Sequence, residues 1–188
     1  MTNFPSIPKP PSKPSSIIPY FDVIVLWLPT PVDQRMIERL RKHCGDLHCG
    51  THPARWNRRW GQGFQQRLEF KQPRMKALRW IARQDDGRIN YAQVTVDYIY
   101  TLAARAATRT YLHRHLTRRW HCSQEIRFYD NDEENTRYDG PSTAPNLITI
   151  YQEDYCRITD ESYCLHIEWR AKGVKAVRAV GIRRRATC

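Results

Sequence analysis

Two candidate strands with a short connection, residues 145–173, decide the fold; they read PNLITIYQEDYCRITDESYCLHIEWRAKG. In each strand apolar residues alternate with polar ones, and successive side chains of a strand point to opposite faces. The apolar residues therefore predict one face that packs on a core. The other face collects Tyr151 from the first strand and His166, Glu168 and Arg170 from the second. A phenol, an imidazole, a carboxylate and a guanidinium on one face form a candidate reaction site.

The rest of the chain supplies further strands and helices. Alternation or apolar runs predict strands over 20–28, 66–70, 91–100, 125–130 and 136–140. Helical spacing predicts helices over 31–42, from Pro73 to about 84, over 101–120 and over 173–180, with Thr30 as the first N-cap and Met75 facing the core. Helices between the early strands, and strands that run together later, predict an α+β fold. We expect a mixed or largely antiparallel sheet, with helices mainly on one face and an open face that carries the site.

The 188 residues suffice for one domain of ordinary size. Half of the twelve prolines lie in residues 1–19, which predicts a disordered arm, followed by a single domain over 20–182 and a basic tail over 183–188. No apolar run is long enough to span a membrane, and the six cysteines lie scattered in a chain too large to need disulfides. These features predict a cytoplasmic protein with reduced thiols and no membrane partner.

The net charge of +12 favours an anionic partner, with nucleic acid first. Residues 55–63 interleave arginine with tryptophan, the composition of a surface on which Arg binds phosphates and Trp stacks on bases. The alternative interpretation is a loop whose tryptophans complete the core. The basic and aromatic residues that we expect to contact DNA are Arg55, Trp56, Arg58, Arg59, Trp60, Arg67, Arg105 and Arg109.

Period-two alternation in the other strands adds carboxylates to the polar face. That face collects Arg67, Glu69, Thr95, Asp97, Thr149, Tyr151, His166, Glu168 and Arg170. Glu69, Asp97 and Glu168 are candidates to hold Mg²⁺ or Mn²⁺, which prefer oxygen ligands. Tyr151 is the candidate nucleophile toward a phosphodiester, with Arg170 and His166 to stabilise the charge that develops. Each of these residues is also compatible with an ordinary solvated sheet face.

A second candidate metal site lies in residues 43–52, which read HCGDLHCGTH. Cys44, His48, Cys49 and His52 supply the four ligands that a structural zinc needs. The spacing matches no common zinc finger, so a polar loop rich in His and Cys is the competing interpretation.

Three patches near the end of the chain resemble, in order, the closing strands of the rolling-circle replication initiators of plasmids and filamentous phages. They are TRYDGPS (136–142), NLITIY (146–151) and LHIEWRAKG (165–173); upstream, QRLEF (66–70) and QVTVDY (93–98) resemble two earlier strands. The resemblance covers about residues 20–182 in short patches, and the order of the patches carries it.

The resemblance implies an enzyme that nicks one DNA strand at an origin through a tyrosine, with a divalent metal, and leaves a 3′-hydroxyl. It implies Tyr151 as the nucleophile, with Tyr138 as the alternative, and Asp97 and Glu168 at the metal site. Origin DNA, single-stranded or hairpin, is the implied substrate; a host helicase and a homodimer are further expected partners.

The sequence also departs from the family pattern. Gln152 and Glu153 stand where Asp-Lys is common, and His166 stands where Arg is common. The paired-histidine metal motif of related nickases is absent from the sequence. These departures keep open the alternative of a non-catalytic, basic nucleic-acid-binding domain of a mobile element.

Overall fold

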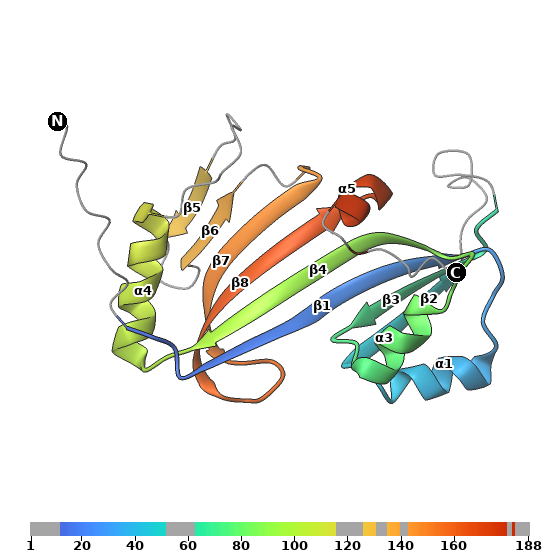
Figure 1. Cartoon of the computed structure of the whole chain (residues 1–188), viewed down its shortest axis with the longest axis horizontal. Coiled ribbons are helices and arrows are strands. Elements are labelled where there is room, and N and C mark those ends of the chain that lie inside the picture. The colour runs from blue at the N-terminus through green and yellow to red at the C-terminus, as the bar shows by residue number, and fades with distance from the viewer. Residues whose placement is uncertain are drawn as a thin grey trace. The chain divides into compact units, whose positions relative to one another are not determined.

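The structure is a computed structural model, and it describes residues 12–51, 63–115, 126–130, 135–139, 143–179 and 182 (Figure 1). The strands are β1 (Ser16–Leu28), β2 (Asp46–Thr51), β3 (Gln66–Lys71), β4 (Arg88–Ile99), β5 (Ile126–Asp130), β6 (Asn135–Asp139), β7 (Asn146–Tyr155) and β8 (Ser162–Lys172). The helices are α1 (Gln34–Arg41), α3 (Met75–Ala82), α4 (Leu102–His115) and α5 (Val174–Ala179).

The strands are hydrogen-bonded in the order β2-β3-β1-β4-β8-β7-β6-β5. The pairings of β3 with β1 and β2, and of β6 with β5 and β7, are antiparallel. The expected α+β class with a largely antiparallel sheet is therefore confirmed. None of the helices in the described part of the chain has the length and apolar character that a membrane span needs.

The chain divides into two compact units that are interleaved in sequence. Unit 1 comprises residues 1–19, 96–142 and 147–168, and unit 2 comprises residues 20–95, 143–146 and 169–188. The division falls inside β4 and β8, so each of these strands contributes residues to both units. Ser16–Pro19, which we expected to belong to a disordered arm, begins strand β1.

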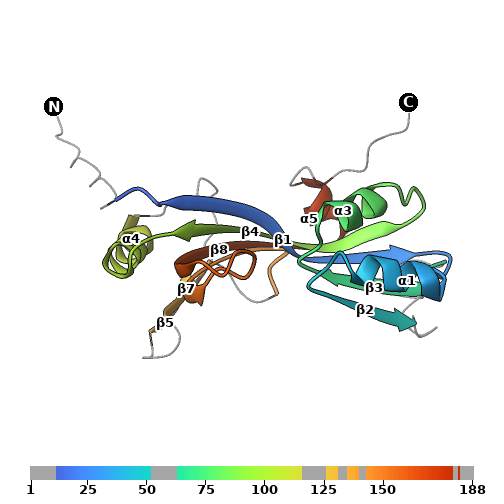
Figure 2. The ribbon, with the colours of Figure 1, turned by 90° about the horizontal axis from the view of Figure 1, so that it is seen from below.

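In unit 2, helices α1 and α3 cover one face of the β1–β3 strands (Figure 2). Ile24 and Leu26 of β1 and Phe70 of β3 are almost fully buried there against Ile37 of α1 and Ile81 of α3. The other face of β1 is also covered, because Val25 and Trp27 pack on Phe64. This two-sided burial explains the nearly continuous apolar run at 23–28, and the strand expected over 20–28 is confirmed as part of β1.

Three local expectations for unit 2 are wrong. Helix α1 begins after Asp33, whose carboxylate accepts a hydrogen bond from the Met36 backbone N–H at 2.8 Å, so Asp33 and not Thr30 is the N-cap. Met75 is 60% exposed and does not face the core. Residues 46–51 form strand β2 rather than a polar loop, because pairing with β3 satisfies their backbone groups.

In unit 1, strands β5 to β8 and the end of β4 form the sheet, and α4 follows β4. Its apolar core includes Ile99 of β4, Cys164 of β8 and Cys156 of the β7–β8 connection, with Ile18 packed against them. The Tyr100 backbone N–H donates to the Tyr163 carbonyl at 3.2 Å and continues the contact between these segments.

Candidate functional site

Four side chains of unit 1 meet on one face of its sheet. Asp97 comes from β4, Tyr151 from β7, and His166 and Glu168 from β8. The period-two spacing of His166 and Glu168 places both on the same face. All four belong to the larger set that the sequence placed on one polar face, and the structure supplies the distances between them.

His166 stands between the two carboxylates. Its Nδ1 lies 2.6 Å from Oδ1 of Asp97, and its Nε2 lies 3.8 Å from Oε2 of Glu168. The Tyr151 hydroxyl lies 3.4 Å from the same Glu168 oxygen, and the Tyr151 ring packs on the imidazole with centroids 4.5 Å apart. These contacts form a series from Asp97 through His166 and Glu168 to the phenol, which we name the polar relay.

The polar relay is buried, and this corrects the expectation of an open face. Asp97 and His166 are 0% exposed and Glu168 is 1% exposed, while Tyr151 is half-buried. Ile150 and Leu165, which were expected to face the core, are buried as well, so both faces of β7 and β8 are covered at these positions. Charges tolerate such burial only when they are paired, and the imidazole between two carboxylates supplies that pairing.

Each titratable group of the relay is shifted by its neighbours. Burial alone lowers the pKa of His166, but the hydrogen bonds and charges of Asp97 and Glu168 outweigh it and raise that pKa. Burial alone raises the pKa of Asp97, but His166 and hydrogen bonds from the thiols of Cys156 and Cys164 lower it overall. The relay therefore favours an imidazolium flanked by carboxylates.

The two candidate tyrosines share the site face. Tyr138 of β6 is directly opposite Thr149 of β7, and Tyr151 lies two residues further along the same face of β7. The hydroxyl of Tyr151 lies beside a relay carboxylate, so a potential base is within reach of this phenol.

Arg170 and Glu69, two other predicted site residues, belong to unit 2. Arg170 is a half-buried residue of β8. The carboxylate of Glu69 accepts a hydrogen bond from the guanidinium of Arg67 on the same strand, β3. Neither is part of the relay of unit 1, so their predicted roles in charge stabilisation and metal binding stay predictions.

The metal prediction can be compared with the donor atoms that unit 1 brings together. Ligand atoms of Asp97, Cys164 and His166 lie within 4.8 Å of one another, all in buried residues. This set offers oxygen, sulfur and nitrogen, whereas Mg²⁺ prefers oxygen alone; a mixed set suits a softer ion such as Zn²⁺. The imidazole, rather than an open space, separates Asp97 from Glu168. The residues do not fit the expected Mg²⁺ site.

Among the predicted DNA contacts, Arg55, Trp56, Arg58, Arg59 and Trp60 lie outside the described residues. Arg105 is 6% exposed, and its Nη1 donates to the Glu153 carbonyl at 2.6 Å while its guanidinium lies over the Tyr163 ring. It therefore ties α4 to the ends of β7 and β8 and is not available to a phosphate, which corrects the prediction. Arg109 is half-buried, and Arg67 is half-buried beside Glu69.

The predicted zinc ligands of residues 43–52 are dispersed around β2. Cys44 is buried, and its thiol donates to the Leu40 carbonyl; burial raises its pKa to about 11. His48 pairs with Asp46 at 2.8 Å, and Cys49 is exposed. His52 lies outside the described residues. Within those residues, the only group of clustered metal ligands is Asp97, Cys164 and His166.

Sequence reasoning missed the two thiols beside Asp97. Burial raises the pKa of Cys164, and the nearby Asp97 carboxylate raises it further, so the thiol stays protonated and donates to Asp97. For Cys164 there was a signal in the sequence, because it lies two residues before His166 and therefore on the same face as His166 and Glu168. Cys156 had no such signal, because it follows the end of β7.

Comparison with known proteins adds a likeness of fold. No family model matches the chain. No curated protein matches it either. A solved structure of a rolling-circle replication initiator protein from Geobacillus stearothermophilus is similar over 89% of this chain and 79% of that chain, with 12% identity and a TM-score of 0.49. A likeness at this level carries no argument about activity, which must come from the residues of the chain itself.

Proposed function

We propose that the chain is a replication initiator that cleaves one DNA strand through Tyr151, in the manner of rolling-circle replication. The observation that carries the proposal is the Tyr151 hydroxyl 3.4 Å from the Glu168 carboxylate, at the end of a buried series of paired charges. The net charge of +12 agrees with a polyanionic substrate.

In this mechanism Glu168 is the general base. A free phenol has a pKa of about 10, so Tyr151 needs a base to react near neutral pH. Its oxygen attacks the phosphorus while the proton passes to Glu168. The bond from phosphorus to the 3′ oxygen breaks, and that oxygen takes a proton from water to become a 3′-hydroxyl, while Glu168 releases the phenol's proton to the hydroxide that is left. The 5′ phosphate remains linked to Tyr151 as a phosphodiester.

His166 and Asp97 act through Glu168. Because His166 is fully buried, it does not contact the phosphate, which differs from the role first expected for it. Its Nε2 lies at an ion-pair distance of 3.8 Å from the Glu168 carboxylate and holds it by charge, and Asp97 holds the imidazole at 2.6 Å from Nδ1. Both are therefore positioning residues. No step is assigned to a metal ion, since the predicted carboxylate set does not form an oxygen-lined site in unit 1.

The test is formation of a covalent protein–DNA adduct. Purified protein is mixed with single-stranded and supercoiled origin-bearing DNA, with Mg²⁺, Mn²⁺ or a chelator, and run on a denaturing protein gel. The proposal predicts an adduct that Tyr151→Phe abolishes and Tyr155→Phe, a change at an exposed tyrosine, leaves intact. An adduct lost instead in Tyr138→Phe would move the nucleophile, and no adduct under any condition would favour the non-catalytic binding domain.

A further inference from the structure

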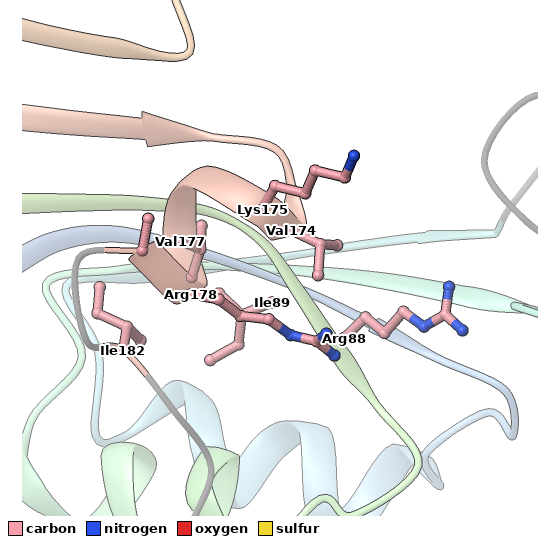
Figure 3. A pocket seen from close by; sticks show the side chains of 8 residues that line it. Arg88, Ile89, Val174, Lys175, Val177, Arg178 and Ile182 are labelled. Carbon is pink, nitrogen blue, oxygen red and sulfur yellow. The ribbon is translucent and has the colours of Figure 1, made fainter.

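Three hollows follow one another on unit 2, and we call them together the basic tract. The first, of about 600 Å³, lies between α5 and the start of β4 (Figure 3). The second, of about 310 Å³, shares Arg88, Val174 and Lys175 with the first. The third, of about 390 Å³, shares Trp27 and Asn90 with the second. Hollows that adjoin one another through shared lining residues suit an extended ligand better than a compact one.

The first hollow combines cations with an apolar floor. Arg88, Lys175 and Arg178 line it and are exposed, and Figure 3 shows the guanidinium groups of Arg88 and Arg178 reaching the same side of the cavity. Among the described residues, no carboxylate lines this hollow and no ion pair involves any of the three cations. Ile89 and Val177 form the floor and join the core under α5.

The second hollow is aromatic, and the third is mixed. Trp27 and Phe64 line the second and pack edge to face, and the Arg88 guanidinium lies 5.1 Å from the Phe64 ring centroid. The third hollow is lined by Tyr91 and Gln93 and by Arg67, whose guanidinium pairs with Glu69. Within the described part of the chain, the cations without a carboxylate in the lining are thus concentrated at the α5 end of the tract.

We propose that the basic tract binds a single-stranded nucleic acid, with backbone phosphates on Arg88, Lys175 and Arg178 and a base against the apolar lining of the first hollow. Uncompensated cations select an anion, and an apolar surface next to them selects one whose charged groups alternate with flat apolar rings. The choice of nucleic acid as this anion rests on the proposed function. The sequence-based DNA contacts did not include these three cations, so the tract is an additional surface.

The experiment is binding of a fluorescent oligo(dT) of about twenty nucleotides, measured by anisotropy over a range of salt concentrations. Each phosphate contact on a single strand contributes about 0.7 to the slope of log affinity against log salt. Loss of one contact therefore weakens binding about fivefold near 0.1 M salt. We expect that loss in Lys175→Ala and Arg178→Ala, with a slope that falls by about 0.7 in each.

The matched controls are Lys76→Ala and Arg79→Ala, which remove exposed cations of α3 in the same unit. Binding by the controls should stay within about twofold of wild type, since neither Lys76 nor Arg79 lines the tract and an exposed charge outside it contributes only a screened interaction. Equal weakening in tract and control variants would overturn the proposal, as would wild-type protein that does not bind oligo(dT). Binding of free inorganic phosphate that competes fully at millimolar concentration would reduce the tract to a phosphate site and also overturn it.

This result is separable from the test of strand cleavage. If tract variants bind weakly while Tyr151→Phe binds normally but forms no adduct, both proposals hold. If tract-dependent binding is observed and no variant or wild type forms an adduct, the tract stands and the cleavage proposal falls. If an adduct forms and binding does not depend on the tract, the cleavage proposal stands and the tract proposal falls.

Discussion

The polar relay of unit 1 and the basic tract of unit 2 use charge in opposite ways. In the relay, Asp97, His166 and Glu168 are buried and pair with one another. In the tract, Arg88, Lys175 and Arg178 are exposed and have no carboxylate among the residues that line their hollow. Buried paired charges are held in a fixed geometry, which suits proton transfer, whereas exposed cations attract a polyanion. Under our two proposals, strand cleavage belongs to unit 1 and binding of a single strand belongs to unit 2.

The largest expected effect is loss of the covalent adduct, which should be separable from loss of DNA binding. Tyr151→Phe should abolish the covalent adduct and leave affinity for oligo(dT) within about twofold, because one hydroxyl outside the tract is removed. Arg178→Ala should weaken binding about fivefold near 0.1 M salt and still form the adduct when DNA is saturating. Gel assay and anisotropy on the same preparations give both readings. A variant that loses both properties while remaining folded by circular dichroism would break the comparison.

Replacement of His166 tests whether the relay positions Glu168. His166→Gln removes the cation between the two carboxylates. Glu168 should therefore keep its proton to higher pH, and the acidic limb of the pH profile of the adduct rate should shift to higher pH. The rate near neutral pH should fall about 10- to 100-fold, as expected for a misplaced base. A merely structural role would lower the rate without moving the pH profile, and single-turnover rates across pH distinguish the two.

Stability of unit 1 should depend on pH in a direction set by the relay. The raised pKa of His166 contributes stability that is fully present below its ordinary value of about 6.5 and is lost as pH rises through the folded value. The lowered pKa of Asp97 contributes stability that is present above about 3.9 and is lost as pH falls through the folded value. Thermal melting should therefore be highest between those two values.

The same melts in His166→Phe should lose the decline on the alkaline side that His166 causes. A melting profile identical to that of wild type above about pH 6.5 would contradict the imidazolium between the carboxylates.

A smaller effect is expected where α4 meets the end of β7. Arg105→Met removes a charged donor from the Glu153 carbonyl in a buried place and should lower the free energy of unfolding by about 2 kcal/mol. Arg157→Met removes an exposed pair with the carboxylate of the same Glu153 and should cost less than about 0.5 kcal/mol. Denaturant titration of both compares a buried with an exposed arginine, and equal losses would contradict the structural role of Arg105.

A further small effect is expected in unit 2, where loss of a helix cap should lower stability without changing the pH dependence. Asp33→Ala removes the side-chain cap of α1 and should cost about 1 kcal/mol of stability. The pH dependence assigned to the relay should be unchanged, since Asp33 belongs to the other unit. Denaturant titration at two pH values measures both quantities.

Most of the strands and the membership of the relay followed from period-two alternation. His166 and Glu168 share a face because they are two residues apart, and that holds whichever side of the strand is buried. The burial of that face could not be predicted, because His166 and its carboxylates read as solvated polar residues until their mutual distances are known. The β2 strand was also missed, since its residues carry no alternation and are ordered by pairing with β3.

The central claim is that Glu168 accepts the proton of Tyr151, and single-turnover adduct formation by Glu168→Gln tests it most directly. Glu38→Gln is the matched control, an exposed carboxylate of α1 in unit 2 that accepts a hydrogen bond from Gln34. The account predicts that Glu168→Gln lowers the rate about 10²- to 10⁴-fold, as loss of a general base does, while Glu38→Gln stays near wild type. An unchanged rate in folded Glu168→Gln would contradict the account.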